Sequence, residues 1–315
     1  MTNIYPVLSA RPLPSETDMI KKWGGKIKPK VSVCCSTFNH FYYIEDAIRS
    51  FLAQETTFPF EIIIRDDAST DGTTEVIKDY VKRYPSIIRV IVNDTNQFAF
   101  ERAIHVWPKV ARGDYIALCE GDDFWIDPHK LERQVSLMEN YPGASMCVAL
   151  CYHCRQTENG LVIEETTPFL GSEILGFEEI DQAYYHTSTY LVPKALFKEV
   201  VERYFAGHCL FGDTALREIL ITMGPFVLLP KVVSVYRITG AGIWSGRDES
   251  SKLEWNTLMT KKLIRCLPWP YKIRQYRKLA YFTNERMKNN LKNGFFLRAL
   301  MLYPQFIWYK VLGAL

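Results

Sequence analysis

Between residues 31 and 151 the chain alternates between strand-like and helix-like segments, and this alternation limits its possible folds more than any other feature. The strand-like runs are short, apolar and rich in β-branched residues, and they lie at residues 31–35, 60–65, 87–92, 114–119 and 144–151. The intervening segments repeat apolar residues three and four positions apart, as in residues 44–52, which is typical of helices that cover a sheet. The pattern predicts an α/β fold with a mostly parallel sheet flanked by helices.

The second half of the chain is less regular. We expect strands at residues 186–192 and 232–238 and helices at residues 193–203 and 213–221. From residue 252 onward the pattern becomes helical and basic. We therefore predict a lead-in over residues 1–30, a main domain over 31–251 that divides near residue 150, and a helical C-terminal extension over 252–315.

Composition narrows the class of protein. Apolar residues make up 48% of the 315 residues and charged residues 23%, which is a globular composition. The net charge of +3 is too small to indicate nucleic acid as the main partner. That sum hides a gradient, because residues 1–251 hold 25 basic and 33 acidic residues (−8), whereas residues 252–315 hold 13 and 2 (+11).

The sequence also indicates the cellular compartment in which the protein is expected. Eight widely spread cysteines are too few for a disulfide scaffold in a chain of this length, and they favour a reducing compartment. No uncharged apolar run approaches the roughly 18–20 residues that span a bilayer. The first residues lack a basic segment followed by an apolar one, so we expect no signal peptide and a cytoplasmic protein.

Polar side chains follow three of the predicted strands, where each strand ends. The three segments are STFNH (36–40), DDASTDGT (66–73) and EGDDFW (120–125). In parallel sheets ligands bind beyond the carboxyl ends of the strands, so these segments predict a polar site. Three acids in the last segment suit a hard divalent cation, although a solvated acidic turn would also explain them. In the same way, a turn with a helix cap would explain Ser69 to Thr73.

These segments, in this order, resemble the family-2 glycosyltransferases of GT-A fold. The resemblance rests on residues 31–54, 66–73 and 111–135, and it is close over about 30–150. It implies transfer of a sugar from a nucleoside diphosphate to an acceptor hydroxyl, with inversion. Residues 31–150 would then form the nucleotide-sugar-binding half, and 151–251 the acceptor half.

The resemblance also implies roles for matching residues. Ser36, Thr37, Phe38 and Asn39 would lie along the nucleotide. Asp66 or Asp67, together with Ser69, would bind near the base. Asp122 and Asp123 would form a DxD-like element for Mn²⁺ or Mg²⁺, with Asp123 as the main metal ligand and Asp122 nearer the ribose. Glu120 stands where many relatives have Asp.

The second half supplies the remaining candidates. Asp213, at the start of a predicted helix, matches the general base that such enzymes place there, and it also suits an N-cap. Arg237 and Trp244 lie in a segment that resembles a loop over the donor phosphates, although packing or an ion pair would also explain them. His186 could face the acceptor or be structural.

The resemblance implies further expectations about partners. We expect a UDP-sugar donor, a glycan or lipid-linked acceptor in surface glycan assembly and, because QxxRW is absent, addition of one sugar at a time. The basic, apolar residues 252–315 either contact the inner face of the cell membrane or pack on the main domain. The alternatives are a sugar nucleotidyltransferase, disfavoured by the lack of glycine in STFNH, and an inactive nucleotide-sugar-binding scaffold.

Overall fold

The structure is a computed structural model that describes residues 12–314 except Ala99, Asn159, 206–211, Ala241, Ile243 and Ser245. Its strands are β1 (Val31–Thr37), β2 (Phe60–Asp66), β3 (Ile88–Val92), β4 (Tyr115–Glu120), β5 (Phe124–Trp125), β6 (Met146–Thr157), β7 (Gly160–Thr166), β8 (Ile174–Leu175), β9 (Leu191–Pro193) and β10 (Phe226–Ile238). Its α-helices are α2 (Glu16–Lys22), α3 (Ile44–Leu52), α4 (Thr73–Arg83), α5 (Ala103–Val110), α6 (Lys130–Asn140), α7 (Lys194–Val200), α9 (Asp213–Leu220), α10 (Glu249–Cys266), α11 (Tyr271–Lys292) and α12 (Phe296–Ala314). Short 3₁₀ turns lie at Glu179–Asp181 and Thr187–Thr189, and a π-helical turn lies at Val201–Phe205.

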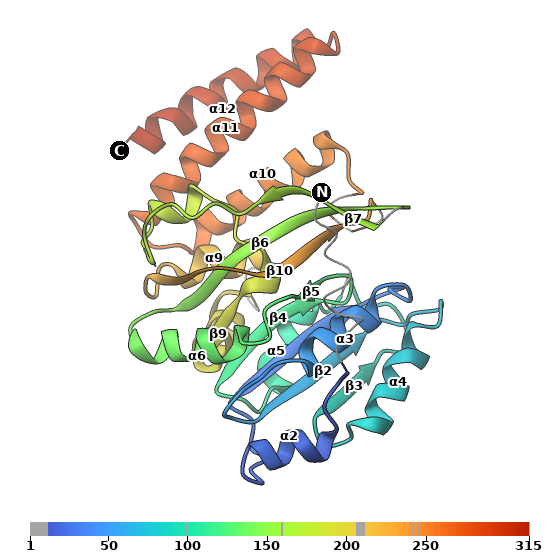
Figure 1. Ribbon diagram of the computed structural model, residues 1–315. Coiled ribbons are helices and arrows are strands. Elements are labelled where there is room, and N and C mark those ends of the chain that lie inside the picture. Colours follow the sequence, from blue (N-terminus) through green and yellow to red (C-terminus); the bar gives the residue numbers. More distant parts are fainter. Residues whose placement is uncertain are drawn as a thin grey trace. The chain divides into compact units, whose positions relative to one another are not determined.

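The described strands form one ten-stranded sheet (Figure 1) with the main order β3-β2-β1-β4-β9-β6-β10-β5. Strands β3, β2, β1 and β4 are parallel to one another, and β6 is parallel to β10. Strand β9 is antiparallel to both β4 and β6. The predicted α/β fold, with a mostly parallel sheet flanked by helices and a helical C-terminus, is confirmed.

The first half folds as its periodicity predicts. Strands β1 and β2 are almost entirely buried, as expected for parallel strands covered on both faces. Their alternate residues Val33 and Ile62 belong to one apolar core together with Ile48 of α3, Ile77 of α4 and Val135 of α6. Helices α5 and α7 pack against each other outside this core.

The second half differs from the sequence prediction at several strands, because β7 and β8 were not predicted and β10 begins at Phe226 rather than at residue 232. The segment 186–192, predicted as a continuous strand, instead forms a 3₁₀ turn at Thr187–Thr189 before the short strand β9. Side chains stabilise the turn, because the Ser188 amide donates to His186 Nδ1 at 3.2 Å and the Thr189 hydroxyl donates to the His186 carbonyl at 2.7 Å. Such local bonds compete with strand pairing.

The chain divides into two compact units. The first comprises Met1–Val201 and Met223–Thr239, and so contains the whole described sheet. The second comprises Glu202–Thr222 and Gly240–Leu315, and so contains α9 as well as α10, α11 and α12. Among the described residues, we find no helix that has both the length and the apolarity to cross a membrane.

Candidate active site

The three polar segments meet at one edge of the first unit. Strands β2, β1 and β4 are neighbours, and their register pairs Asp66 with Thr37 and Ser36 with Glu120. The carboxyl ends of these three parallel strands therefore lie side by side. Residues that are far apart in the sequence form a single polar rim there, which is where α/β folds bind ligands.

The loops after β1 and β2 hold each other through hydrogen bonds. Asn39 adopts a left-handed backbone conformation (φ 54°), and its amide donates to the Ser69 hydroxyl at 2.9 Å. Its side-chain oxygen accepts from the Thr70 amide at 2.9 Å. Asp66 is fully buried and accepts from the Ser69 hydroxyl at 2.5 Å and from the Thr74 hydroxyl. Asn39, Asp66 and Ser69 thus fix the shape of the rim.

Two predicted nucleotide residues have different surroundings. Asp67 accepts from Asn93 Nδ2 at 2.6 Å and from the Gln97 amide at 2.8 Å, which ties the segment after β3 to the rim. Its Oδ1 also lies 3.8 Å from the Arg65 guanidinium. Phe38, by contrast, leaves 43% of its surface exposed, so its ring offers a face for an aromatic base.

The acidic loop after β4 approaches the loop after β1 very closely. The Gly121 amide donates to the Ser36 carbonyl at 2.9 Å. A Cβ atom at Gly121 would lie 2.7 Å from Thr37 Oγ1 and 3.0 Å from His40 Nδ1. Both of these buried atoms have no hydrogen-bond partner among the described residues. A glycine in the EGDD segment is therefore needed for this contact.

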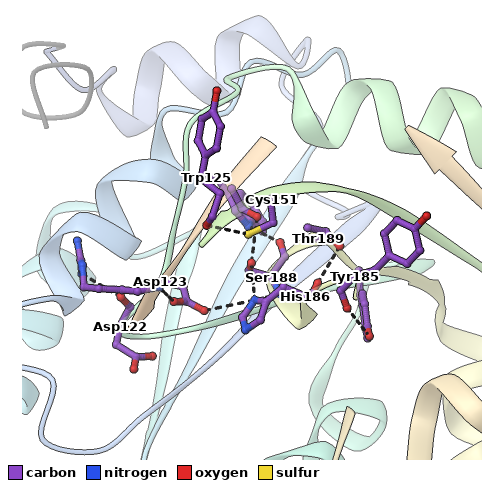
Figure 2. A network of polar contacts seen from close by, with 12 residues as sticks. Asp122, Asp123, Trp125, Cys151, Tyr185, His186, Ser188 and Thr189 are labelled. Carbon is purple, nitrogen blue, oxygen red and sulfur yellow. Dashed lines mark hydrogen bonds and ion pairs between the residues drawn. The ribbon is translucent and has the colours of Figure 1, made fainter. Parts of the chain in front are cut away.

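The two aspartates of that loop face different partners. Asp122 is partly exposed, and its Oδ2 lies 3.9 Å from His40 Nε2. Asp123 is buried, and its Oδ1 accepts from the Arg237 amide at 2.8 Å. The other oxygen, Oδ2, lies 3.6 Å from His186 Nδ1. Figure 2 shows His186 between Asp123 and Ser188.

Arg237 of β10 is enclosed beneath the acidic loop. Its guanidinium donates to Asp46 Oδ2 at 2.7 Å and to the Asp122 carbonyl at 2.9 Å. The same group lies over the rings of Tyr43 and Phe124, 4.8 and 4.9 Å from their centroids. The Arg237 side chain is buried. Through its two hydrogen bonds it connects β10 to α3 and to the acidic loop. The ion-pair interpretation made from sequence is therefore confirmed.

Three side chains come together as donors for a cation. One ligand atom from each of Glu120, Asp123 and His186 lies within 4.8 Å of the other two. Carboxylate oxygens are ligands that suit Mn²⁺ or Mg²⁺. An imidazole is a ligand that suits transition metals. Thr37 Oγ1, which lacks a hydrogen-bond partner among the described residues, adds an oxygen at the same rim. The donor set therefore fits a divalent cation, with Asp122 outside the three.

The electrostatics of this group agree with that fit. Burial raises the pKa of Asp123 well above its ordinary value, and the carboxylates of Asp122 and Glu120 raise it further. A cation would relieve this repulsion. Burial lowers the pKa of His186 to about 3, with His153 contributing. The imidazole is therefore neutral at pH 7, the form in which histidine binds metals.

Two predicted residues belong to the second unit. Asp213 is the first residue of α9, and Gly212 occupies the N-cap position, so the N-cap interpretation of Asp213 is wrong. Its Oδ1 accepts from the Thr214 amide at 2.7 Å. Trp244 is 43% exposed in a turn where the Arg247 amide donates to its carbonyl.

Sequence reasoning missed part of this arrangement. His186 was predicted to face the acceptor or to be structural, and not to approach the acidic loop, while Glu120 was counted among the acids that suit a cation but was not named as a ligand. Asp46 lies within a helix stripe and gave no signal. The only available hint was the position of His186 beside small polar residues that favour a turn. Its approach to Asp123 depends on the pairing of β9 with β4, which no local pattern reveals.

Comparisons with known proteins agree with this geometry. The profile of glycosyl transferase family 2 matches residues 32–205, more than half of the chain. An uncharacterised protein of Mycobacterium tuberculosis is 31% identical over 231 residues, which is 72% of this chain and 64% of that protein. An uncharacterised glycosyltransferase of Methanocaldococcus jannaschii is 29% identical over 182 residues, 56% of this chain and 59% of that one.

Solved structures share the fold. TarS of S. aureus superposes with a TM-score of 0.56 at 20% identity, over 89% of this chain and 78% of that one. The mannosyltransferase PcManGT of Pyrobaculum calidifontis, in complex with GDP-Man and Mn²⁺, gives a TM-score of 0.54 at 15% identity, over 94% and 91%.

The chain therefore belongs to glycosyltransferase family 2, with a GT-A-like fold. The predicted family resemblance is confirmed. The matched region spans 64% of the length of the mycobacterial relative.

Proposed function

We propose that this protein is a non-processive, inverting glycosyltransferase that moves a sugar from a UDP-sugar to an acceptor hydroxyl. The observation that carries the proposal is the junction of three polar segments at the carboxyl ends of β2, β1 and β4. That edge is where an open α/β sheet binds its ligand. Membership of family 2 supports the same reaction class.

The nucleotide would bind along the rim formed by the first two segments. Phe38 offers an exposed ring for stacking on the base, and Asp67 and Asp122 offer carboxylate oxygens for base and ribose. Ser36, Thr37, Asn39, Asp66 and Ser69 would shape this cradle. Related folds have been solved with UDP-GlcNAc and with GDP-Man, which supports a nucleotide-sugar donor.

We propose that Asp123 is a ligand of Mn²⁺ or Mg²⁺, as the sequence predicts, and that Glu120 and His186 join it. Asp122 would remain close enough to help through its partly exposed carboxylate. Such a cation neutralises the charge that develops on the leaving diphosphate. Arg237, predicted from sequence to lie near the donor phosphates, would act by holding the Asp122–Asp123 loop in place, because its buried guanidinium is bound to Asp46 and the Asp122 carbonyl.

Catalysis with inversion needs a base for the acceptor hydroxyl, and we assign this role to Asp213. Trp244 would contact the donor or the sugar. The acceptor would be a glycan or a lipid-linked precursor of surface glycan assembly, at the inner face of the cell membrane. These assignments rest on the family pattern and on the positions of the residues in their elements.

A thermal-shift screen of nucleoside diphosphates tests the donor and the cation together. Ligands that bind the folded state stabilise it, by about 2.7 kcal/mol at a concentration of 100 Kd. We expect UDP with Mn²⁺ to raise the melting temperature, and UDP with EDTA to raise it much less. Stabilisation by GDP alone would exclude the UDP assignment, and no shift with any nucleotide would favour the scaffold alternative.

The Asp123→Asn variant tests the cation site. We expect it to abolish the Mn²⁺-dependent part of the UDP shift while the protein stays folded, because Asn keeps an oxygen that accepts from the Arg237 amide. Asp79→Asn, which removes an exposed carboxylate from α4, is the matched control and should behave like the wild type. An undiminished Mn²⁺ effect in Asp123→Asn would remove Asp123 as a ligand.

A further inference from the structure

One face of α12 in the second unit is apolar and exposed along its whole length. The side chains of this face are Phe296, Leu297, Leu300, Met301, Pro304, Ile307, Trp308 and Val311. At 100° per residue they share an arc of roughly 140° around the helix, and no charged residue lies within that arc. Leu300 and Trp308 leave 69% and 61% of their surfaces exposed. We call this set the α12 face.

The opposite side of α12 packs on α11, which fixes the direction of the α12 face. Helices α11 and α12 lie side by side (Figure 1). The Arg277 side chain of α11 donates to the Gly313 carbonyl at 2.8 Å, and Tyr276 stacks with Tyr309 at 6.4 Å. A Cβ atom at Gly313 would lie 2.9 Å from Arg277 Cγ. This close contact leaves the α12 face pointing away from α11.

A water-soluble helix normally turns polar residues outward, so the α12 face is the reverse of the usual pattern. Contiguous apolar patches of this kind mark sites where proteins meet another surface. On one side the face is followed by the partly buried Leu312 and then by Gln305 and Arg298, and on the other side by Tyr303 and Lys310. Basic and amphipathic side chains at the edge of an apolar stripe are typical of a helix that lies in a membrane interface.

Charge indicates what covers the face. Residues 252–315 carry 13 basic and only 2 acidic residues. Two copies joined through this face would bring two such segments together, and their like charges would repel. An anionic bilayer has the complementary charge, and it attracts clusters of lysine and arginine close to its surface. The charge therefore favours a lipid surface over a second copy.

We propose that the α12 face docks into the interface of a bilayer that contains anionic phospholipid. The helix lies parallel to the membrane with its apolar side chains below the headgroups. Trp308 sits at headgroup level, where its amphipathic ring is favoured. Arg298 and Lys310, on the two sides of the α12 face, contact the lipid phosphates. Docking does not depend on the proposed transfer reaction, and it brings the protein to the surface where lipid-linked acceptors are found.

Vesicle flotation of the full chain tests the proposal. We expect binding to vesicles of phosphatidylcholine and phosphatidylglycerol (7:3) to be at least roughly tenfold tighter than to phosphatidylcholine alone. Leu300→Glu should weaken that binding roughly tenfold, because it places a carboxylate within the apolar stripe. Gln305→Glu adds the same charge to the same helix outside the stripe, and should bind almost like the wild type.

A second measurement locates the helix directly. Brominated phosphatidylcholine in the mixed vesicles should quench tryptophan fluorescence, and Trp308→Phe should remove most of the quenched signal while binding persists. Equal loss of binding in Leu300→Glu and Gln305→Glu, or equal binding to both vesicle types, would overturn the proposal. So would concentration-dependent dimerisation without vesicle binding that Leu300→Glu abolishes, because the face would then join two copies.

Discussion

Single residues at the rim show how closely its shape depends on side-chain size. Gly121 has no space for a Cβ atom, because Thr37 Oγ1 and His40 Nδ1 would lie 2.7 and 3.0 Å from it.

Hydrogen bonds to Asp71 also fix the shape of the rim. Asp71 accepts from the Phe41 amide at 2.9 Å and from the Thr73 hydroxyl at 2.6 Å. Burial raises the pKa of Asp71, but hydrogen bonds from Thr73 and Phe41 outweigh it and lower the pKa. The rim is thus built before any ligand arrives.

Gly121→Ala should therefore damage both stability and nucleotide binding. Overpacking of this kind costs about 1–3 kcal/mol, and the displaced Thr37 would disturb the acidic loop. Urea unfolding and UDP calorimetry with Mn²⁺ measure the two effects. Gly143→Ala is the control, because nothing lies within 4 Å of a Cβ atom there. Equal behaviour of the two variants would show that the loop yields easily.

The elements show which parts of the fold the sequence could predict. Strands β1, β2, β3 and β4 and helices α3 and α4 were predicted because each has a complete apolar repeat that tertiary contacts reinforce. The turn at Thr187–Thr189 was missed because side-chain hydrogen bonds, which no periodicity reveals, replace strand pairing there. The predicted carboxylates of the rim lie together because they follow the ends of neighbouring parallel strands, and those strands could be predicted from the sequence. His186 reaches Asp123 only through tertiary structure.

Helix α9 is anchored to α11 by one buried carboxylate. Glu218 accepts from Gln275 Nε2 at 2.7 Å and Lys278 Nζ at 2.9 Å, and Arg274 lies 3.3 Å away. Burial raises the pKa of Glu218, but Lys278, Arg217 and Arg274 outweigh it and lower the pKa to about 2. The anchor therefore stabilises the fold fully above the ordinary value of 4.5, and is lost as the pH falls towards 2.

Glu218→Gln should destabilise the protein by about 3–5 kcal/mol near pH 7, because it leaves buried cations without their anion. The variant should also lose less stability than the wild type between pH 5 and pH 3, the window in which Glu218 protonates more readily in the unfolded chain. Urea unfolding at several pH values measures both effects. Glu285→Gln, which breaks an exposed pair with Lys288, should cost under about 1 kcal/mol. Parallel pH curves for wild type and Glu218→Gln would contradict this account.

At the scale of the whole molecule, the proposed work is divided between the two compact units. The rim residues that would bind nucleotide and cation belong to the first unit, and Asp213 belongs to the second. Charge is divided in a similar way, since the net charge of +3 is the sum of −8 over residues 1–251 and +11 over residues 252–315. Sequence alone showed this division of charge, but it did not show that α9 groups with the C-terminal helices, because that grouping rests on tertiary contacts such as those of Glu218 with α11.

This division predicts that binding and turnover can be separated by mutation. Asp213→Asn should lower kcat by about 10²–10⁴-fold, the usual contribution of a general base, and should leave the UDP affinity with Mn²⁺ unchanged. Asp248→Asn is the matched control, because it removes an acid at the start of α10 in the same unit while Asn still caps the helix. Transfer assays and calorimetry on the same samples give both quantities. A full transfer rate in Asp213→Asn would exclude it as the base, and a parallel loss of UDP affinity would assign Asp213 to donor binding instead.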